Sequence, residues 1–272
     1  MTVLLVAGPP EVRAVGMPGD SEMGKAIFEG NLKAAELALE LGADINGGGG
    51  NPPLQDAAGR GYIDVVRFLL DKGADVDAAG PSGSPALSAA AGAGHLEVVR
   101  LLIKRGASVR ALDALGRSAL MEAAAGGHQA VAAFLLEQGA PTDVLETGGA
   151  TILMYAAVSC STGTVRLLLE RGADVNAASN SGWTALLAAA RRGCVPVAKT
   201  LLDRDALVNA SAEDGKTPLI LAAASGKVEL VRLLLDNGAD PAARDRDGDT
   251  ALSVAQKKGD AAIVKLLKEA RP

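Results

Sequence analysis

A leucine returns at a constant interval of 33 residues along most of the chain. It stands at Leu54, Leu87, Leu120, Leu153, Leu186, Leu219 and Leu252. A pair of small residues follows three positions later, from Ala57 and Ala58 in the first copy to Ala222 and Ala223 in the sixth. A repeat of this length predicts a row of similar units that bury a shared core between neighbours.

Each unit carries the pattern of two short helices. The leucine and the alanine pair mark one face of a first helix, and a glycine such as Gly193 closes it because glycine accepts a left-handed backbone. A second apolar row, for example residues 230–235, predicts a second helix that ends before Gly238. Polar and small residues then lead to the next unit, which is typical of a turn. One helix pair cannot bury both of its faces, so we expect an all-α solenoid of stacked pairs.

The repeat resembles the ankyrin repeat, most closely in GKTPLILAAASGKVELVRLLLDNGAD at 215–240 and GWTALLAAARRG at 182–193. The resemblance implies an ankyrin-repeat solenoid of helix-turn-helix units joined by β-turn or hairpin fingers. Residues 21–272 divide into about eight repeats, at 21–49, 50–82, 83–115, 116–148, 149–181, 182–214, 215–247 and 248–272. Met23, Ala26 and Gly30 fit the leucine, alanine and glycine positions of the first. Residues 1–20 fit no repeat, and their prolines and glycines predict disorder.

The sequence departs from the family pattern at two places. The histidine that follows the leucine in the family motif is replaced by Gln55, Ser88, Met121, Met154, Leu187, Ile220 and Ser253. The resemblance implies that this histidine ties neighbouring turns together, so packing has to hold more of this stack. The glycines at 47–50 predict a mobile joint between the first two units, because glycine restricts the backbone little.

Composition disfavours several classes of partner. With 27 basic and 32 acidic residues the net charge is −5, which offers no general attraction to nucleic acid or to anionic lipid. No apolar stretch approaches the roughly 20 residues of a membrane span. We therefore expect a soluble monomer in the cytoplasm, with the nucleus as an alternative.

Residues that could hold a metal are few. His95 and His128 lie 33 apart, so they could share a metal, or they could simply obey the repeat. A closed zinc site requires four ligands and nothing else is placed to join them, so we expect no metal. Asp245, Asp247 and Asp249 resemble part of a calcium loop but lack its final glutamate.

Catalytic chemistry is equally poorly supported. Cys160 and Cys194 occupy inter-helix positions of successive units. Stacked helices lie about 8 to 10 Å apart, whereas a disulfide needs Cα atoms within about 7 Å, so we expect two free thiols. The glycines near Gly92 close one helix instead of following a buried strand, which argues against a phosphate loop. We expect no cofactor and no enzymatic activity.

The resemblance implies a protein-interaction scaffold or adaptor that binds a folded partner through its groove and turn tips. The alternatives are a regulatory or inhibitory subunit, or a host-directed effector, that controls an enzyme or channel through the same surface. An enzyme of unrecognised type is a third hypothesis. A single recovered protein partner would favour the first two, and turnover by the purified chain would favour the third.

The binding surface is expected around Trp183, which stands in a variable turn position. Tyr155 takes the groove-facing position of the preceding unit, and Arg191 and Arg192 close the first helix that follows Trp183. Tryptophan, tyrosine and arginine are the residues enriched at binding hot spots. Further candidates stand in the same turn or groove positions of other units: Arg117, Lys216, Glu122 and Asp249. The basic residues among them predict a partner with an acidic patch. Trp183 could instead pack on the neighbouring turns.

Overall fold

The computed structural model describes residues 18–47 and 50–270, and these residues form sixteen α-helices and no strand. In chain order the helices are α1 (Pro18–Glu29), α2 (Leu32–Glu40), α3 (Pro53–Arg60), α4 (Ile63–Asp71), α5 (Ala86–Ala93), α6 (Leu96–Lys104), α7 (Ala119–Ala125), α8 (Gln129–Glu137), α9 (Ile152–Val158), α10 (Thr162–Glu170), α11 (Ala185–Arg192), α12 (Val195–Leu202), α13 (Pro218–Ser225), α14 (Val228–Asp236), α15 (Ala251–Lys258) and α16 (Ala261–Glu269). Successive pairs form units one to eight, so that α9 and α10 belong to unit five and α11 and α12 to unit six.

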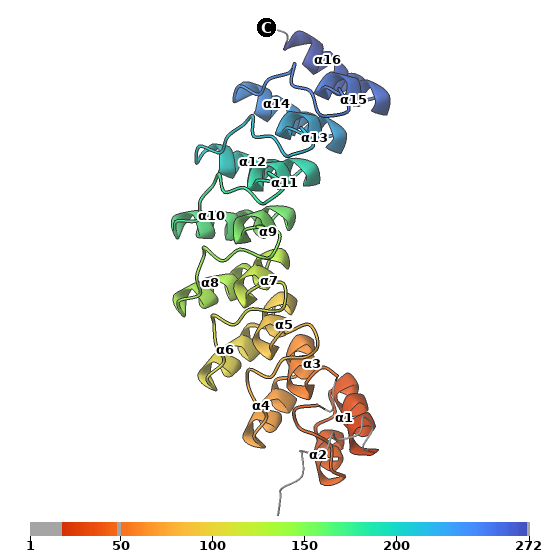
Figure 1. Ribbon diagram of the computed structural model, residues 1–272, viewed down its shortest axis with the longest axis vertical. Coiled ribbons are helices and arrows are strands. Elements are labelled where there is room, and N and C mark those ends of the chain that lie inside the picture. The colour runs from red at the N-terminus through yellow and green to blue at the C-terminus, as the bar shows by residue number, and fades with distance from the viewer. Residues whose placement is uncertain (1–17, 48–49, 271–272) are drawn as a thin grey trace, which may run out of the picture.

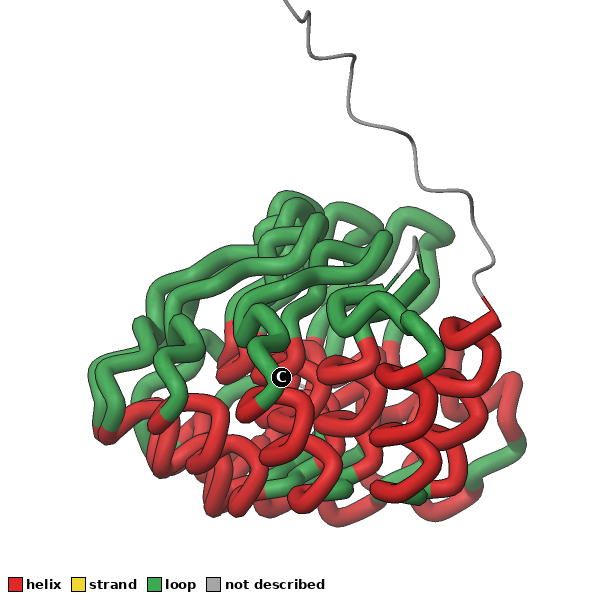
Figure 2. Tube along the Cα trace, turned by 90° about the horizontal axis from the view of Figure 1, so that it is seen from below, coloured by secondary structure: helices red, strands yellow, loops and turns green. Residues whose placement is uncertain are grey.

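The units stack in chain order into one elongated solenoid (Figure 1). The odd-numbered helices form one column and the even-numbered helices form a second column beside it. The long connections between units lie together along one edge of the stack, beyond the helices (Figure 2). We call these connections fingers. The predicted all-α solenoid of helix pairs joined by turns is therefore confirmed.

The ends of the first helices follow from the repeated sequence. Most begin at a serine or threonine whose hydroxyl accepts the amide of the third helical residue, as Thr184 does for Leu187 at 3.3 Å. Gly193 ends the same helix with a left-handed φ of 73°. In α11 the short motif thus sets both the start and the stop of the first helix.

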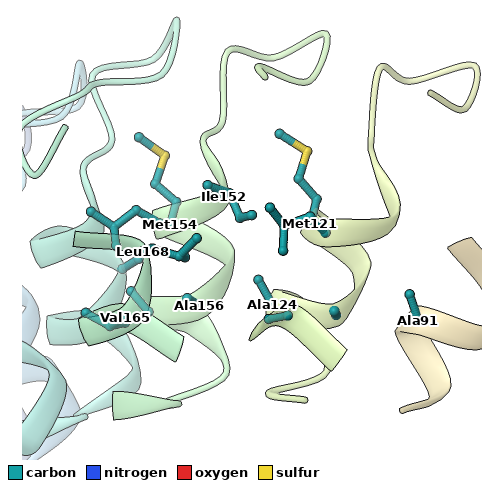
Figure 3. Packing of buried hydrophobic residues seen from close by; sticks show 14 of the residues in the cluster. Ala91, Met121, Ala124, Ile152, Met154, Ala156, Val165 and Leu168 are labelled. Carbon is teal, nitrogen blue, oxygen red and sulfur yellow. The ribbon is translucent and has the colours of Figure 1, made fainter. Parts of the chain in front are cut away.

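The repeated leucines and alanines form the core. Leu54, Leu87, Leu120, Leu153, Leu186 and Leu219 are at most 1% exposed, and the alanine pairs beside them are fully buried. Alanine lets adjacent first helices approach closely, so the apolar seam is continuous from unit to unit. Met121 and Met154 stand where the family motif has histidine, and both side chains extend from the first helices toward the fingers (Figure 3). Both are buried, so they contribute apolar packing at this position, and Met154 Sδ also accepts the amide of Thr151 at 3.5 Å.

Backbone hydrogen bonds join the tips of successive fingers. The amide of Asn180 donates to Gly148 O at 3.1 Å, and the amide of Glu213 donates to Ser181 O at 2.9 Å. At the far ends of the fingers, Asn176 Oδ1 accepts the amide of Leu207 at 2.8 Å. These bonds fix the spacing of the fingers although no sheet is formed.

His95 and His128 take the position that the repeat assigns to them. Their Nε2 atoms bond to the carbonyl oxygens of Gly59 and Gly92 in the preceding units, at 3.2 and 3.0 Å. Each ring packs against the closing glycine of the preceding unit. A Cβ atom on Gly61, for example, would lie only 2.6 Å from His95 Nδ1. The histidines therefore link units, and the repeat accounts for both.

The prediction of two free thiols is wrong, because Cys160 and Cys194 form a disulfide with their Cα atoms 5.5 Å apart. The prediction used the spacing of helix axes, but neither cysteine lies inside a helix. Cys160 follows α9 in a left-handed conformation with φ of 57°, and Cys194 precedes α12. They occupy the same two positions as Gly61 and His95, which touch across units.

The N-terminal boundary also differs from the prediction. Helix α1 begins at Pro18, and Asp20 accepts the amide of Asp44 at 2.9 Å, so residues 18–20 belong to the first unit. The rest of the segment for which disorder is predicted, and positions 48–49 of the predicted glycine joint, lie outside the described residues. In the part of the chain that the structure describes, no helix is long and apolar enough to cross a membrane.

Candidate partner-binding pocket

A pocket of about 380 Å³ lies where the fingers before α9 and α11 meet these two helices. We call it the unit five–six pocket. Tyr155 and Val158 of α9 line it together with Ala188 and Arg191 of α11. The two fingers contribute Glu146 and Trp183, respectively. The pocket therefore combines apolar walls with one acidic and one basic side chain.

Trp183 is held at the base of a tight turn. The amide of Ser179 donates to Trp183 O at 2.8 Å, and the amide of Trp183 donates to Ser179 Oγ at 3.2 Å. Gly182 turns the chain with a φ of 75°, and a Cβ there would lie 3.2 Å from Ser211 O of the next finger. The turn fixes the backbone of Trp183 and leaves its side chain half-buried at the pocket.

Arg191 stacks on the indole ring. Its guanidinium carbon lies 4.7 Å from the centroid of Trp183, the geometry of a cation–π contact. Within the described residues, Arg191 forms no ion pair with a carboxylate. The guanidinium thus positions the indole and keeps its hydrogen-bond donors for another group.

Tyr155 is linked to the other charge in the pocket. Its hydroxyl donates to the Glu146 carboxylate. Burial raises the pKa of Tyr155 above its usual range, and the hydrogen bond and negative charge of Glu146 raise it further, because ionisation would place two anions side by side. The neutral phenol is therefore favoured in the folded protein.

Tyr155 is expected to lose its proton only well above the ordinary tyrosine pKa of about 10. The unfolded chain would ionise first as the pH rises past that value, so the free energy of unfolding should fall there, and Tyr155→Phe should reduce the fall. The difference in phenolate absorbance between the wild type and Tyr155→Phe during alkaline titration isolates this group. Glu146→Gln should bring the pKa down. If Tyr155 ionised at about pH 10 in the wild type as well as in Glu146→Gln, the hydrogen bond to Glu146 would not raise its pKa.

Arg117 and Glu122 do not join this pocket. They pair with each other one unit earlier, at 2.9 Å, and Arg117 also pairs with the buried Asp113 at 2.8 Å. Burial acts to lower the pKa of Arg117, but the charges of Glu122 and Asp113 outweigh it and raise the pKa. Burial raises the pKa of Glu122. The charge expected to attract an acidic partner is thus neutralised within the chain.

The other three predicted residues also lie apart from the pocket. Lys216, in the next finger, pairs with Asp214 at 2.6 Å. Asp249 pairs with Lys257 in unit eight, also at 2.6 Å. Arg192 points across the far end of α11, where its Nε donates to Val158 O at 3.2 Å. The structure therefore brings together Tyr155, Trp183 and Arg191 from the predicted set.

Sequence reasoning missed Glu146 and Val158. Glu146 stands 33 residues after Asp113, and each carboxylate turns to a side chain that follows it closely in the chain, Tyr155 for Glu146 and Arg117 for Asp113. Val158 stands 33 residues before Arg191. Aligning the finger and helix-end positions across units would have indicated both, although spacing alone would not have shown that they share a pocket.

A solenoid of stacked helix pairs with aligned fingers is the architecture of a repeat protein that offers an extended binding surface. The chain belongs to the ankyrin-repeat family. The family model described as "Ankyrin repeats (3 copies)" matches residues 5–80, 78–146, 138–212 and 205–272. Ankyrin repeats generally mediate protein–protein interaction.

Known proteins with similar sequence share short stretches of this chain. Protein phosphatase 1 regulatory subunit 27 of Mus musculus is 40% identical over 63 residues, which are 22% of this chain and 41% of that protein. A putative ankyrin repeat protein of Rickettsia felis is 39% identical over 61 residues, 21% of this chain and 27% of that protein. The chain thus matches less than half the length of either.

A solved structure covers more of the chain. The human ASB11 ankyrin repeat domain superposes with a TM-score of 0.74 and 27% sequence identity. The match covers 82% of this chain and 99% of that chain.

Proposed function

We propose that the chain is a non-catalytic scaffold or adaptor that binds a folded protein partner through its groove and finger tips. The observation that carries the proposal is the unit five–six pocket, where a tryptophan, a tyrosine and an arginine meet. These are the side chains that dominate binding energy at protein interfaces. The chain acts as a monomer in the cytoplasm, with the nucleus as the alternative.

The pocket favours a partner segment of mixed character. Its walls suit an apolar side chain, and Arg191 presents donors that an acidic group of the partner can accept. We expect the acidic group of the partner to contact Arg191, because Arg117 and Lys216 already form ion pairs within the chain. The net charge of −5 argues against nucleic acid or a membrane surface as the partner.

The alternative is a regulatory or inhibitory subunit, or a host-directed effector, that acts on an enzyme or channel through the same surface. The local similarity to a phosphatase regulatory subunit favours the regulatory role. Both roles require partner binding at the same pocket, so the partner that is recovered decides between them.

Filling the pocket should abolish partner recovery. We expect affinity capture from cell extract, followed by mass spectrometry, to recover one partner in a near-stoichiometric amount with the wild type and none with Ala150→Arg. Ala150 lines the pocket, and the fold accepts arginine at the equivalent finger position, Arg117. Ser84→Arg places the same side chain in the same finger position two units earlier and should retain the partner.

Two outcomes would contradict this proposal. Equal recovery by wild type, Ala150→Arg and Ser84→Arg would mean that the partner binds elsewhere. Turnover of a substrate by the purified chain alone would identify an enzyme instead of a scaffold.

A further inference from the structure

The disulfide joins the two helices that line the unit five–six pocket. Cys160 lies two residues after Val158, and Cys194 lies three residues after Arg191. The bond therefore connects the ends of α9 and α11 directly beside the pocket. Any change in the separation of these ends changes the distance between Tyr155 and Val158 on one side and Arg191 on the other.

The disulfide replaces a contact made at other junctions. At the junctions between units two and three and between units three and four, a histidine reaches back to a carbonyl oxygen of the preceding unit. Cys194 stands in that histidine position, and Cys160 stands in the position of the closing glycine. Without the disulfide, the bond from Arg192 to Val158 O is the side-chain hydrogen bond that remains between these helix ends. Because the chain has two cysteines, reduction acts at this junction and at none of the others.

The two cysteines differ in exposure. Cys160 is exposed, whereas Cys194 is 5% exposed. Of the two residues, Cys160 is therefore the one that an external thiolate approaches from solvent, while Cys194 is shielded. This is the arrangement of an entry cysteine with a resolving cysteine behind it.

We propose that Cys160 and Cys194 are a reversible redox clamp, which in the oxidised state holds α9 and α11 at the spacing that the unit five–six pocket requires for its partner. This inference rests on the proposed function. In a reducing compartment, disulfides are usually transient or redox-sensing, so the pair would close under oxidation and open again afterwards.

The exchange balances with glutathione as the redox partner. On closing, the Cys160 thiolate attacks glutathione disulfide, which gives a mixed disulfide at Cys160 and releases one glutathione thiolate. Cys194 Sγ, as a thiolate, then attacks Cys160 Sγ and displaces the second glutathione. Two protein thiols and one glutathione disulfide become one protein disulfide and two glutathione molecules. Reduction follows the same steps in reverse, beginning with attack of a glutathione thiolate on Cys160 Sγ.

Counting thiols across a series of glutathione ratios tests the chemistry. Circular dichroism should show that both states are folded. Iodoacetamide, added in denaturant so that the buried Cys194 is also reached, should then modify two cysteines of the reduced chain and none of the oxidised chain. In the Cys194→Ser variant the mixed disulfide cannot be resolved, so mass spectrometry should detect glutathione attached to Cys160. The proposal is overturned if the folded chain keeps two free thiols in excess glutathione disulfide, or if it closes only after unfolding.

Trp183 is the single tryptophan of the chain, so its emission reports on the pocket without a partner. Reduction should shift its emission maximum and increase its quenching by acrylamide. Cys160→Gly/Cys194→His, which installs the residue pair of Gly61 and His95, should fold and show no response to redox state. An identical emission maximum in the reduced and oxidised wild type would overturn the clamp.

Binding separates this inference from the function on which it rests. The protein recovered by capture should bind the oxidised chain at least about fivefold more tightly than the reduced chain, a typical size for coupling between two sites. Equal affinity for the two states would refute the clamp and leave the scaffold role intact. If no protein binds either state, the scaffold role fails, and the thiol and fluorescence measurements still decide whether the cysteines clamp the pocket.

Discussion

Replacing Leu153 with aspartate is expected to unfold the middle of the stack. Leu153 is 1% exposed in α9, between the first helices of the neighbouring units. The substitution removes a buried leucine, which alone costs about 2 to 5 kcal/mol, and it also buries a carboxylate without a partner. We expect the free energy of unfolding to fall by at least about 4 kcal/mol.

Urea unfolding followed by circular dichroism measures this loss, and Leu145→Asp is the matched control. Leu145 lies in the finger that leads into α9 and is 56% exposed, so the same substitution there should change stability by no more than about 0.5 kcal/mol. Because each unit contacts mainly its neighbours, the Leu153→Asp chain should unfold in more than one step. Equal midpoints for the two variants would show that the leucine repeat is not the core.

The repeated part of the fold could be predicted from the sequence, because the positions that are buried recur every 33 residues, as the leucines and alanines do. Leu186 and the alanines Ala189 and Ala190 are buried because an equivalent helix lies on each side of them. The turn residues are equally local, since Thr184 and Gly193 act on the helix that lies between them. Fold and register therefore follow from spacing alone.

The features that break the period were harder to predict, because they depend on which positions touch across units. The separation of Cys160 and Cys194 is one repeat plus one residue, and only the geometry of the inter-helix turn shows that these positions meet. The same holds for the charges. From the sequence, Arg117 was expected to be available to an acidic partner. In the structure it forms ion pairs with Asp113 of the same finger and with Glu122 of α7.

Trp183→Ala is expected to weaken partner binding by about 2 kcal/mol or more, roughly 30-fold, with little change in the melting temperature. The indole forms one wall of the unit five–six pocket and holds the guanidinium of Arg191 against it. Its removal opens the pocket to water and frees Arg191. The buried leucines and alanines of α11 remain in place, so the stack should keep its stability.

Titration of the captured partner against each variant, together with thermal unfolding, separates binding from folding. Leu207→Ala is the control, because Leu207 is a 61% exposed apolar residue of unit six that does not line the pocket. It should change neither quantity. If Trp183→Ala instead lowers the melting temperature while the remaining folded protein binds normally, the indole serves to pack the fingers together. In that case the partner must bind at a surface other than the unit five–six pocket.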